Sequence, residues 1–169
     1  SIADAIPDSP AITTGDTTRT WAEYDDRGAR MAQALTAAGL GPDSKVGLFM
    51  YNSNEYMETH YGVFKMRGVA INVNYRYLDE ELWYLLDNSD SEAIVFHASL
   101  ADRVARVIDR LPKLKLLVDT GASMTALTRE SFRRLARQHF SLLGTRLFNT
   151  ANGYTRGDIY RTSALTLGE

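Results

Sequence analysis

The chain has 169 residues, of which 44% are hydrophobic and 24% are charged, and it contains no cysteine. This balance is typical of a folded globular protein, and the lack of cysteine excludes disulfides, thiolate metal sites and cysteine nucleophiles. No apolar run approaches the roughly 20 residues of a membrane-spanning helix. The first residues lack the basic and apolar stretches of a secretory signal, so we expect a cytoplasmic protein without a transmembrane segment.

The net charge of −2 conceals an asymmetry along the chain. Residues 1–98 carry 15 acidic and 7 basic side chains, a balance of −8, whereas residues 99–169 carry 6 acidic and 12 basic ones, a balance of +6. Such a split can mark a nucleic-acid-binding face. Because no recognition motif accompanies it, we interpret it as solvated helix faces and expect no nucleic-acid partner.

The first elements predicted are a hairpin and a helix. Residues 12–21 read as a hairpin that turns at Gly15-Asp16. Thr20 and Glu23 then have the spacing of a capping box, which predicts the start of a helix. Apolar or small residues recur along this helix at steps of three and four, as expected of one buried stripe. The stripe consists of Trp21, Tyr24, Gly28, Met31 and Leu35.

Short apolar runs then alternate with helical patterns as far as residue 118. The runs predict strands at 46–50, 69–73, 93–96 and 114–118. The helical patterns predict helices at 54–67, 79–86 and 99–111. In the first of these helices we expect Met57, Tyr61 and Phe64 to face inward. The alternation indicates an α/β fold over residues 1–118, in which helices flank a mostly parallel sheet.

The pattern changes after Val118. A small polar turn occupies residues 119–123, and a basic helix is predicted over 128–138. Two strands around the turn at Asn152-Gly153 are predicted within 145–167. We therefore expect a second part over 119–169, a small strand-rich α+β tail.

Residues 10–117 resemble the N-terminal part of acyl-CoA synthetases, in the adenylate-forming (AMP-binding) superfamily. The segments that carry the resemblance are Thr20-Trp21-Ala22-Glu23-Tyr24-Asp25-Asp26-Arg27, Gly39-Leu40-Gly41-Pro42, Tyr51-Asn52-Ser53-Asn54-Glu55-Tyr56 and Asn72-Val73-Asn74-Tyr75-Arg76-Tyr77. The resemblance implies activation of a carboxylate by ATP and transfer of the acyl group to CoA.

That chemistry needs a Gly/Ser/Thr-rich phosphate loop ending in lysine, because backbone N–H groups and a cation must hold the triphosphate. The family also uses acidic residues for Mg²⁺ and ribose, and a mobile C-terminal domain with a lysine. None of these motifs is found in the sequence, so no catalytic residue of the family is carried over and no cofactor is expected. The expected function is that of a scaffold fragment of a fatty acid/acyl-CoA ligase, which does not catalyse alone.

Residues 116–168 resemble part of a retropepsin-like aspartic protease. The resemblance is carried by Leu117-Val118-Asp119-Thr120-Gly121-Ala122-Ser123, and downstream by Thr150-Ala151-Asn152-Gly153 and Arg156-Gly157. In this family two carboxylates share one proton and activate water, and each subunit of a homodimer supplies one of them. The resemblance implies that Asp119 is the carboxylate, that Thr120 braces the partner's loop, and that Gly121 permits the tight backbone path.

Two features oppose the protease interpretation. Ligase-like sequence occupies the place of the strand that should precede the aspartate strand, and the segment that completes a protease lobe is not found. Asp119-Thr120-Gly121 can also be a simple turn after a strand. A homodimeric endopeptidase using Asp119 is therefore the alternative function, and a non-enzymatic protein-binding module is a second alternative.

Metal binding is not expected, because His60, His97 and His139 lie far apart and show no ligand spacing. Residues for a specific partner are not evident either. A homodimer or a protein partner remains open.

Overall fold

The computed structural model describes residues 1–120, 125–128, 141–150 and 153–161. It divides the chain into two compact units, Ser1–Thr128 and Arg129–Glu169. The first unit extends beyond Val118, because strand β7 (Thr125–Thr128) pairs with strand β6 (Leu116–Asp119) in one sheet. That residues 119–169 form a second part of the chain stays a prediction.

A five-stranded sheet with the order β4-β3-β5-β6-β7 forms the centre of the first unit. Its remaining strands are β3 (Lys45–Phe49), β4 (Val69–Asn72) and β5 (Ala93–Phe96). Neighbouring strands from β4 to β6 are parallel, and only β7 is antiparallel. This arrangement confirms the expected α/β fold.

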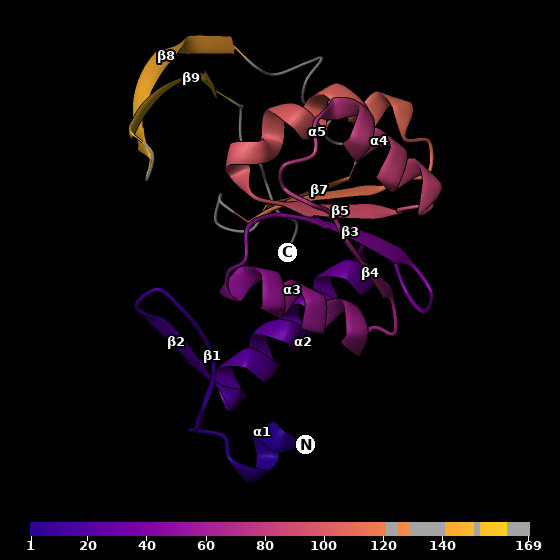
Figure 1. The fold of residues 1–169 in the computed structure, drawn as a ribbon, viewed down its shortest axis with the longest axis vertical. Helices are drawn as coiled ribbons and strands as arrows, with labels where there is room; N and C mark the ends of the chain where they lie inside the picture. The colour runs from indigo at the N-terminus through magenta and orange to yellow at the C-terminus, as the bar shows by residue number, and fades with distance from the viewer. Residues whose placement is uncertain (121–124, 129–140, 151–152, 162–169) are drawn as a thin grey trace. The chain divides into compact units, whose positions relative to one another are not determined.

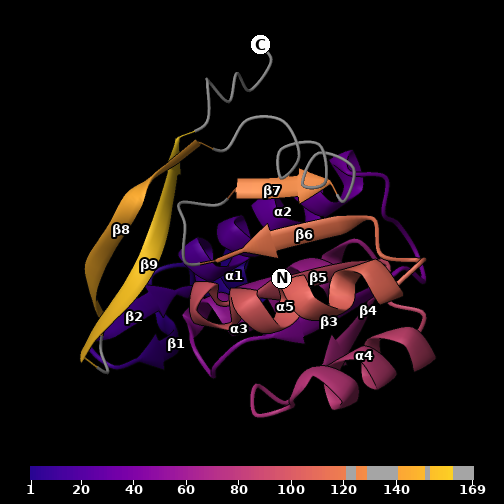
Figure 2. The same cartoon turned by 90° about the horizontal axis from the view of Figure 1, so that it is seen from above.

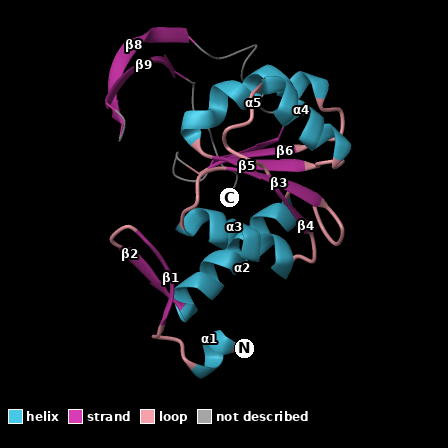
Figure 3. Cartoon of the chain, viewed as in Figure 1, coloured by secondary structure: helices cyan, strands magenta, loops and turns pink. Residues whose placement is uncertain are grey.

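Helices cover both faces of this sheet. They are α2 (Trp21–Ala37), α3 (Asn54–Lys65), α4 (Asp79–Asn88) and α5 (Ala101–Val107). Helices α2 and α3 pack on one face, and α4 and α5 lie side by side on the other (Figures 1, 2 and 3). The expected helix over 99–111 is broken into α5 and two flanking 3-10 turns, Ala98–Leu100 and Ile108–Arg110.

The N-terminal elements confirm the predicted hairpin and capping box. A short helix α1 (Ile2–Ala5) precedes strands β1 (Pro10–Thr14) and β2 (Thr17–Thr20), which form the hairpin. The N–H of Glu23 donates to Thr20 Oγ1 over 3.3 Å, and Glu23 Oε2 accepts from the N–H of Thr20 over 2.9 Å. The reciprocal bonds satisfy backbone donors that the first helical turn leaves free.

Helices α2 and α3 approach closely because each presents a glycine to the other. A Cβ atom on Gly28 would lie 2.6 Å from Tyr61 Cδ1, and one on Gly62 would lie 2.7 Å from Met31 Cβ. The predicted stripe of α2 is otherwise confirmed at Tyr24, Met31 and Leu35, which are buried, whereas Trp21 is half-buried. The two glycines therefore set the spacing of this helix pair.

The expected orientation of α3 was wrong at two of three positions. Met57 and Phe64 are 42% and 55% exposed. Tyr61 is half-buried and stacks on Tyr24 of α2, with ring centroids 4.8 Å apart. The side chains that α3 does bury are Asn54, Glu58, Thr59 and Val63, with Gly62 among them. Three of these are polar, so counting apolar residues could not find the buried face.

Asn54 shows why α3 buries polar groups. Its side-chain Nδ2 donates to the carbonyl oxygen of Thr17 over 3.0 Å, and its Oδ1 accepts from Thr14 Oγ1 over 3.0 Å. The amide thereby ties the start of α3 to the β1–β2 hairpin. A buried polar group is tolerated when its hydrogen bonds are satisfied in this way.

A second polar contact joins the two helices at Asp25. Lys65 Nζ lies 2.9 Å from Asp25 Oδ1, and the Tyr61 hydroxyl donates to the same oxygen over 2.8 Å. The hydrogen bond from Lys65, followed by that from Tyr61, holds the pKa of Asp25 below its usual value. The ionised carboxylate is therefore favoured in the folded state.

Asp25→Asn is expected to make the free energy of unfolding fall less steeply as the pH becomes acidic. Because the pKa of Asp25 is lower in the folded state, its contribution is present above the unfolded value of about 3.9 and is lost as pH falls through the folded value. Since the Asp25 side chain is 32% exposed, we expect the ionised carboxylate to contribute about 0.5–1 kcal/mol to the free energy of unfolding. Urea unfolding at a series of pH values from neutral to acidic measures this pH dependence. Lys65→Met should likewise make the free energy of unfolding fall less steeply at acidic pH. Equal slopes for the parent and both variants would contradict it.

In the second unit, strands β8 (Ser141–Thr150) and β9 (Gly153–Arg161) pair antiparallel. They confirm the two strands predicted around residues 152–153. The predicted basic helix lies outside the described residues, except for Thr128, which belongs to β7.

Candidate functional site

The carboxyl ends of β3, β4, β5 and β6 meet at one edge of the sheet, because these strands are parallel. From β3 the chain proceeds outward to β4 and then crosses back to β5, on the other side of β3. The direction of winding therefore switches between β3 and β5. Open α/β sheets bind ligands at such a switch point, and the residues that follow these strands form the candidate site.

Aromatic side chains gather at this edge. Tyr51, which follows β3, has its ring centroid 5.3 Å from that of His97, which follows β5. It also lies 4.9 Å from the ring of Tyr75, which follows β4, and the Arg76 guanidinium lies 5.4 Å from the same Tyr75 ring. Tyr51 is 39% exposed, so part of this surface remains open to a planar or apolar group.

His97 and Ser99 form a close pair within the cluster. His97 Nδ1 lies 2.9 Å from Ser99 Oγ, and Tyr51 Oη lies 3.4 Å from the same oxygen. A serine beside a histidine is one ingredient of nucleophilic catalysis. Here, however, the backbone N–H of Ser99 also donates to Nδ1 over 3.2 Å, so the imidazole caps the Ala98–Leu100 turn. The pair is suited to shaping this surface more than to activating a hydroxyl.

The segment after β4 is held by backbone contacts. Arg103 Nη1 donates to the carbonyl oxygens of Tyr75 and Tyr77, over 2.9 and 3.0 Å. The Asn74 side chain accepts from the N–H of Arg76 over 3.0 Å. These bonds fix the turn that presents Tyr75 to Tyr51.

Two of the three residues expected to act in catalysis lie at the same edge. Asp119 is the last residue of β6, in register with Phe96 of β5 and Thr125 of β7. The N–H and the hydroxyl of Thr120 both donate to the carbonyl oxygen of Phe96, over 3.0 and 3.3 Å. Gly121 lies outside the described residues. The catalytic role of this trio stays a prediction.

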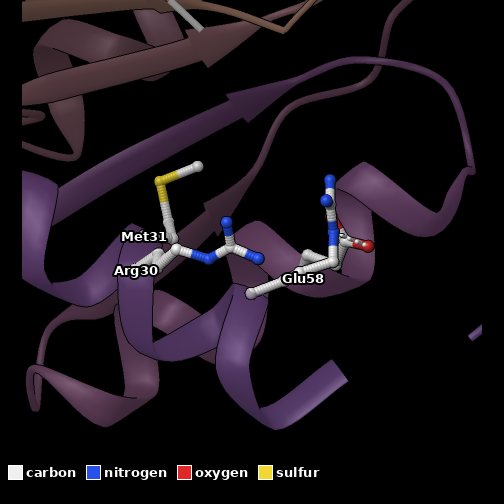
Figure 4. A pocket seen from close by; sticks show the side chains of 4 residues that line it. Arg30, Met31 and Glu58 are labelled. Atoms are coloured by element: carbon white, nitrogen blue, oxygen red, sulfur yellow. Dashed lines mark ion pairs between the residues drawn. The ribbon is translucent and has the colours of Figure 1, made fainter. Parts of the chain in front are cut away.

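A small cavity lies between α2 and α3 (Figure 4). Its volume is about 80 Å³, and its lining residues are Arg27, Arg30, Met31 and Glu58. Pockets for drug-sized ligands measure roughly 300–1,000 Å³, whereas one water occupies about 30 Å³. The cavity is therefore suited to water and too small for a nucleotide.

Two of the lining residues, Arg27 and Glu58, belong to an ion cluster that the sequence did not reveal. Glu58 Oε1 lies 2.6 Å from Arg27 Nε and 3.5 Å from Arg19 Nε, and the Glu58 side chain is only 6% exposed. None of these three atoms makes an aligned hydrogen bond with another protein group, so the contact is ionic. Its position joins β2, α2 and α3, which indicates a structural role. The sequence gives one indication of this cluster. Glu58 lies four residues before Gly62 and therefore on the same side of α3, the side that faces α2.

Within the described parts of the chain, no group of three or more histidine, aspartate and glutamate side chains could hold a metal ion. Over the same residues, no helix has the length and hydropathy needed to cross a bilayer. The expected absence of a metal cofactor stays a prediction.

Comparisons with known proteins identify the family. The family model described as AMP-binding enzyme matches residues 2–143. The medium-chain acyl-CoA ligase Mig of Mycobacterium avium is 37% identical over 131 residues, which cover 70% of this chain and 24% of that protein. A medium/long-chain-fatty-acid–CoA/3-oxocholest-4-en-26-oate–CoA ligase of Mycobacterium tuberculosis is 40% identical over 121 residues, covering 70% and 22%.

Solved structures share the fold. A putative long-chain-fatty-acid CoA ligase from Rhodopseudomonas palustris aligns with a TM-score of 0.69 at 22% identity, covering 94% of this chain and 42% of that one. A benzoate CoA ligase from Burkholderia xenovorans aligns with a TM-score of 0.66 at 18% identity, covering 70% and 24%. At these identities the likeness concerns the fold alone.

None of these findings supports the expected retropepsin-like segment over 116–168, and the residues matched by the family model include Asp119. The chain spans about a quarter of the length of the curated relatives that it matches. The fold comparison and the sequence comparison both point to acyl-CoA ligases. The chain belongs to the family of AMP-binding enzymes, and it corresponds to the N-terminal region of the acyl-CoA ligases in that family.

Proposed function

We propose that this chain is the scaffold segment of a medium- or long-chain fatty acyl-CoA ligase and that it does not activate carboxylates alone. The observation that carries the proposal is a match of 37–40% identity to ligases with these substrates in their names, in a sequence without the phosphate loop that the chemistry requires. From the resemblance to the family, we infer that the phosphate loop and the catalytic lysine belong to the part of a ligase outside the matched segment.

The cavity between α2 and α3 supports this proposal. The cavity beside Glu58 has about 80 Å³, too little for a nucleotide, which needs a pocket of several hundred Å³. The arginines around that cavity are engaged by carboxylates, Arg27 by Glu58 and Arg30 by Asp26. Arg27 therefore stabilises the contact between α2 and α3, Arg30 pairs within α2, and neither cation is directed at a triphosphate.

The purified chain is expected to show no ATP–pyrophosphate exchange above buffer with medium- or long-chain fatty acids. The physical reason is that backbone N–H groups and a cation must hold the triphosphate during adenylation, and the matched segment supplies no such cradle. Radiolabelled pyrophosphate incorporation measures the exchange, and an intact ligase such as Mig serves as the positive control. Acid-dependent exchange that persists through repurification would overturn the proposal.

The aspartic protease alternative gains no supporting observation. Thr120 bonds to the carbonyl oxygen of Phe96 within its own sheet, and the family match covers both Asp119 and Thr120. We therefore propose no second catalytic function.

A further inference from the structure

The imidazole of His97 accepts a hydrogen bond that only its neutral form can accept. His97 follows β5, and the backbone N–H of Ser99 donates to its Nδ1 over 3.2 Å, which caps the turn Ala98–Leu100. A backbone N–H is always a donor, so Nδ1 must present its lone pair. In neutral histidine one ring nitrogen donates and the other accepts. The contact therefore assigns the ring proton to Nε2.

The Ser99 hydroxyl has two neighbouring acceptors but one proton. Its Oγ lies 2.9 Å from His97 Nδ1 and 3.4 Å from the hydroxyl oxygen of Tyr51, which follows β3. While Nδ1 lacks a proton, the shorter contact is a hydrogen bond only if the Ser99 hydroxyl donates to Nδ1. Ser99 then has no proton left for the oxygen of Tyr51.

Protonation of His97 reverses this arrangement. Both ring nitrogens of an imidazolium are donors, so Nδ1–H would donate to Ser99 Oγ, and the serine proton would be free to bond to Tyr51 Oη. The backbone N–H of Ser99 would lose its acceptor, because Nδ1 then carries a proton. A single proton on the imidazole therefore exchanges the cap of the turn for a bond between Ser99 and Tyr51.

We propose that His97 is a pH-sensitive switch at the carboxyl edge of the sheet. The neutral ring caps the Ala98–Leu100 turn, and the charged ring directs the Ser99 hydroxyl to Tyr51. Histidine is the side chain suited to such a switch near physiological pH. Tyr51 is 39% exposed and its ring also contacts Tyr75, so the switch changes the hydrogen-bonding groups that the candidate site presents. The inference does not depend on whether the chain activates carboxylates.

Titratable and charged groups lie on each element around His97, and they influence the pH at which its ring changes charge. They are Tyr51 after β3, Tyr75 and Arg76 after β4, Asp102 and Arg103 on α5, and Asp119 at the end of β6. In general, a nearby carboxylate favours a charged imidazole and a nearby guanidinium opposes it. The exchange of hydrogen-bond partners follows from the charge change itself, so we expect it at whatever pH the ring titrates.

Nuclear magnetic resonance of the full 169-residue chain tests the switch without any substitution. The ring nitrogen shifts of neutral His97 should show a proton on Nε2 and none on Nδ1. As the pH falls through the titration of His97, the Ser99 amide should lose protection from solvent exchange. After correction for the intrinsic effect of pH, we expect a loss of at least about threefold, the size that one hydrogen bond provides. A neutral ring with its proton on Nδ1, or unchanged protection of this amide, would overturn the proposal.

His97→Asn is the matched control, because the side-chain oxygen of asparagine can cap the same turn at every pH. We expect the Ser99 amide of this variant to keep its protection across the whole pH range. The spectrum of the variant also assigns His97 among the three histidines, since one ring signal disappears. If the protection of Ser99 falls with pH in the variant as it does in the parent, another group is responsible and the proposal fails.

Ser99→Ala separates the two halves of the switch, because it removes the hydroxyl and keeps the backbone N–H. In the parent, the Cζ signal of Tyr51 should shift together with the titration of His97. In Ser99→Ala the amide at position 99 should still lose protection, whereas most of the Tyr51 shift should disappear. The remainder comes from the direct contact of the His97 and Tyr51 rings, whose centroids are 5.3 Å apart. An undiminished Tyr51 shift would show that the hydroxyl does not couple the two residues, which would contradict the proposal.

Discussion

Leu35→Ala is expected to lower the free energy of unfolding by about 2–5 kcal/mol, the usual range for truncation of a fully buried leucine. Leu35 lies on α2 with no exposed surface, and it belongs to the core cluster that contains Val46, Leu48 and Val63 of the sheet and α3. Removing its isobutyl group leaves a cavity where the helix pair meets the sheet. The cost is largest where neighbours cannot collapse, and α2 and α3 are already in contact at their glycines.

Equilibrium unfolding in urea, followed by circular dichroism, measures this change. Gln33→Ala on the exposed side of the same helix is the control, and it should shift stability by less than about 0.5 kcal/mol. A loss of similar size in both variants would show that α2 does not pack on the sheet as described.

Arg27→Met is expected to destabilise the fold by about 1–3 kcal/mol. Breaking a buried ion pair costs roughly 3–5 kcal/mol, because the remaining charge stays desolvated, as Glu58 would be with only 6% exposure. Two features reduce the figure here: Arg27 is itself 33% exposed, and Arg19 remains 3.5 Å from the carboxylate.

A double-mutant cycle with Glu58→Leu isolates the interaction energy between the two side chains. The double variant should recover part of the loss, since apolar replacement of a buried pair is often neutral. Arg30→Met is the matched control, because Arg30 and its partner Asp26 are each 62% exposed, and exposed pairs contribute about 0–1 kcal/mol. If Arg27→Met and Arg30→Met cost the same, the cluster at Glu58 has no special role.

Local rules succeeded wherever neighbouring residues decide the structure. The capping box at Thr20 and Glu23 placed the start of α2 at the right residue. The apolar runs placed all four parallel strands within two residues of their ends. Three of them, β3, β5 and β6, are largely buried, and a strand buried on both faces reads as an unbroken apolar stretch. The two strands predicted on either side of residues 152–153 are likewise paired.

The same rules failed on α3, where the partner surface decides which side is buried. Its inward face must accept Arg27 and Arg19 as well as the backbone of the hairpin, and these requirements select Glu58 and Asn54. Neither demand can be read from the spacing of Met57, Tyr61 and Phe64. A short resemblance around Asp119 likewise suggested a protease, although the family match extends across it.

The sequence by itself determined the α/β class, the order of the strands and α-helices between residues 10 and 118, and the relation to acyl-CoA ligases, because each depends on hydrophobic periodicity or on collinear segments. Only the tertiary structure decided the strand order β4-β3-β5-β6-β7, and with it the meeting of Tyr51, Tyr75 and His97 at the switch point. It also decided that Glu58 is buried and Phe64 exposed. These features depend on which surfaces meet in space, and burial is a property of the partner surface as much as of the residue itself.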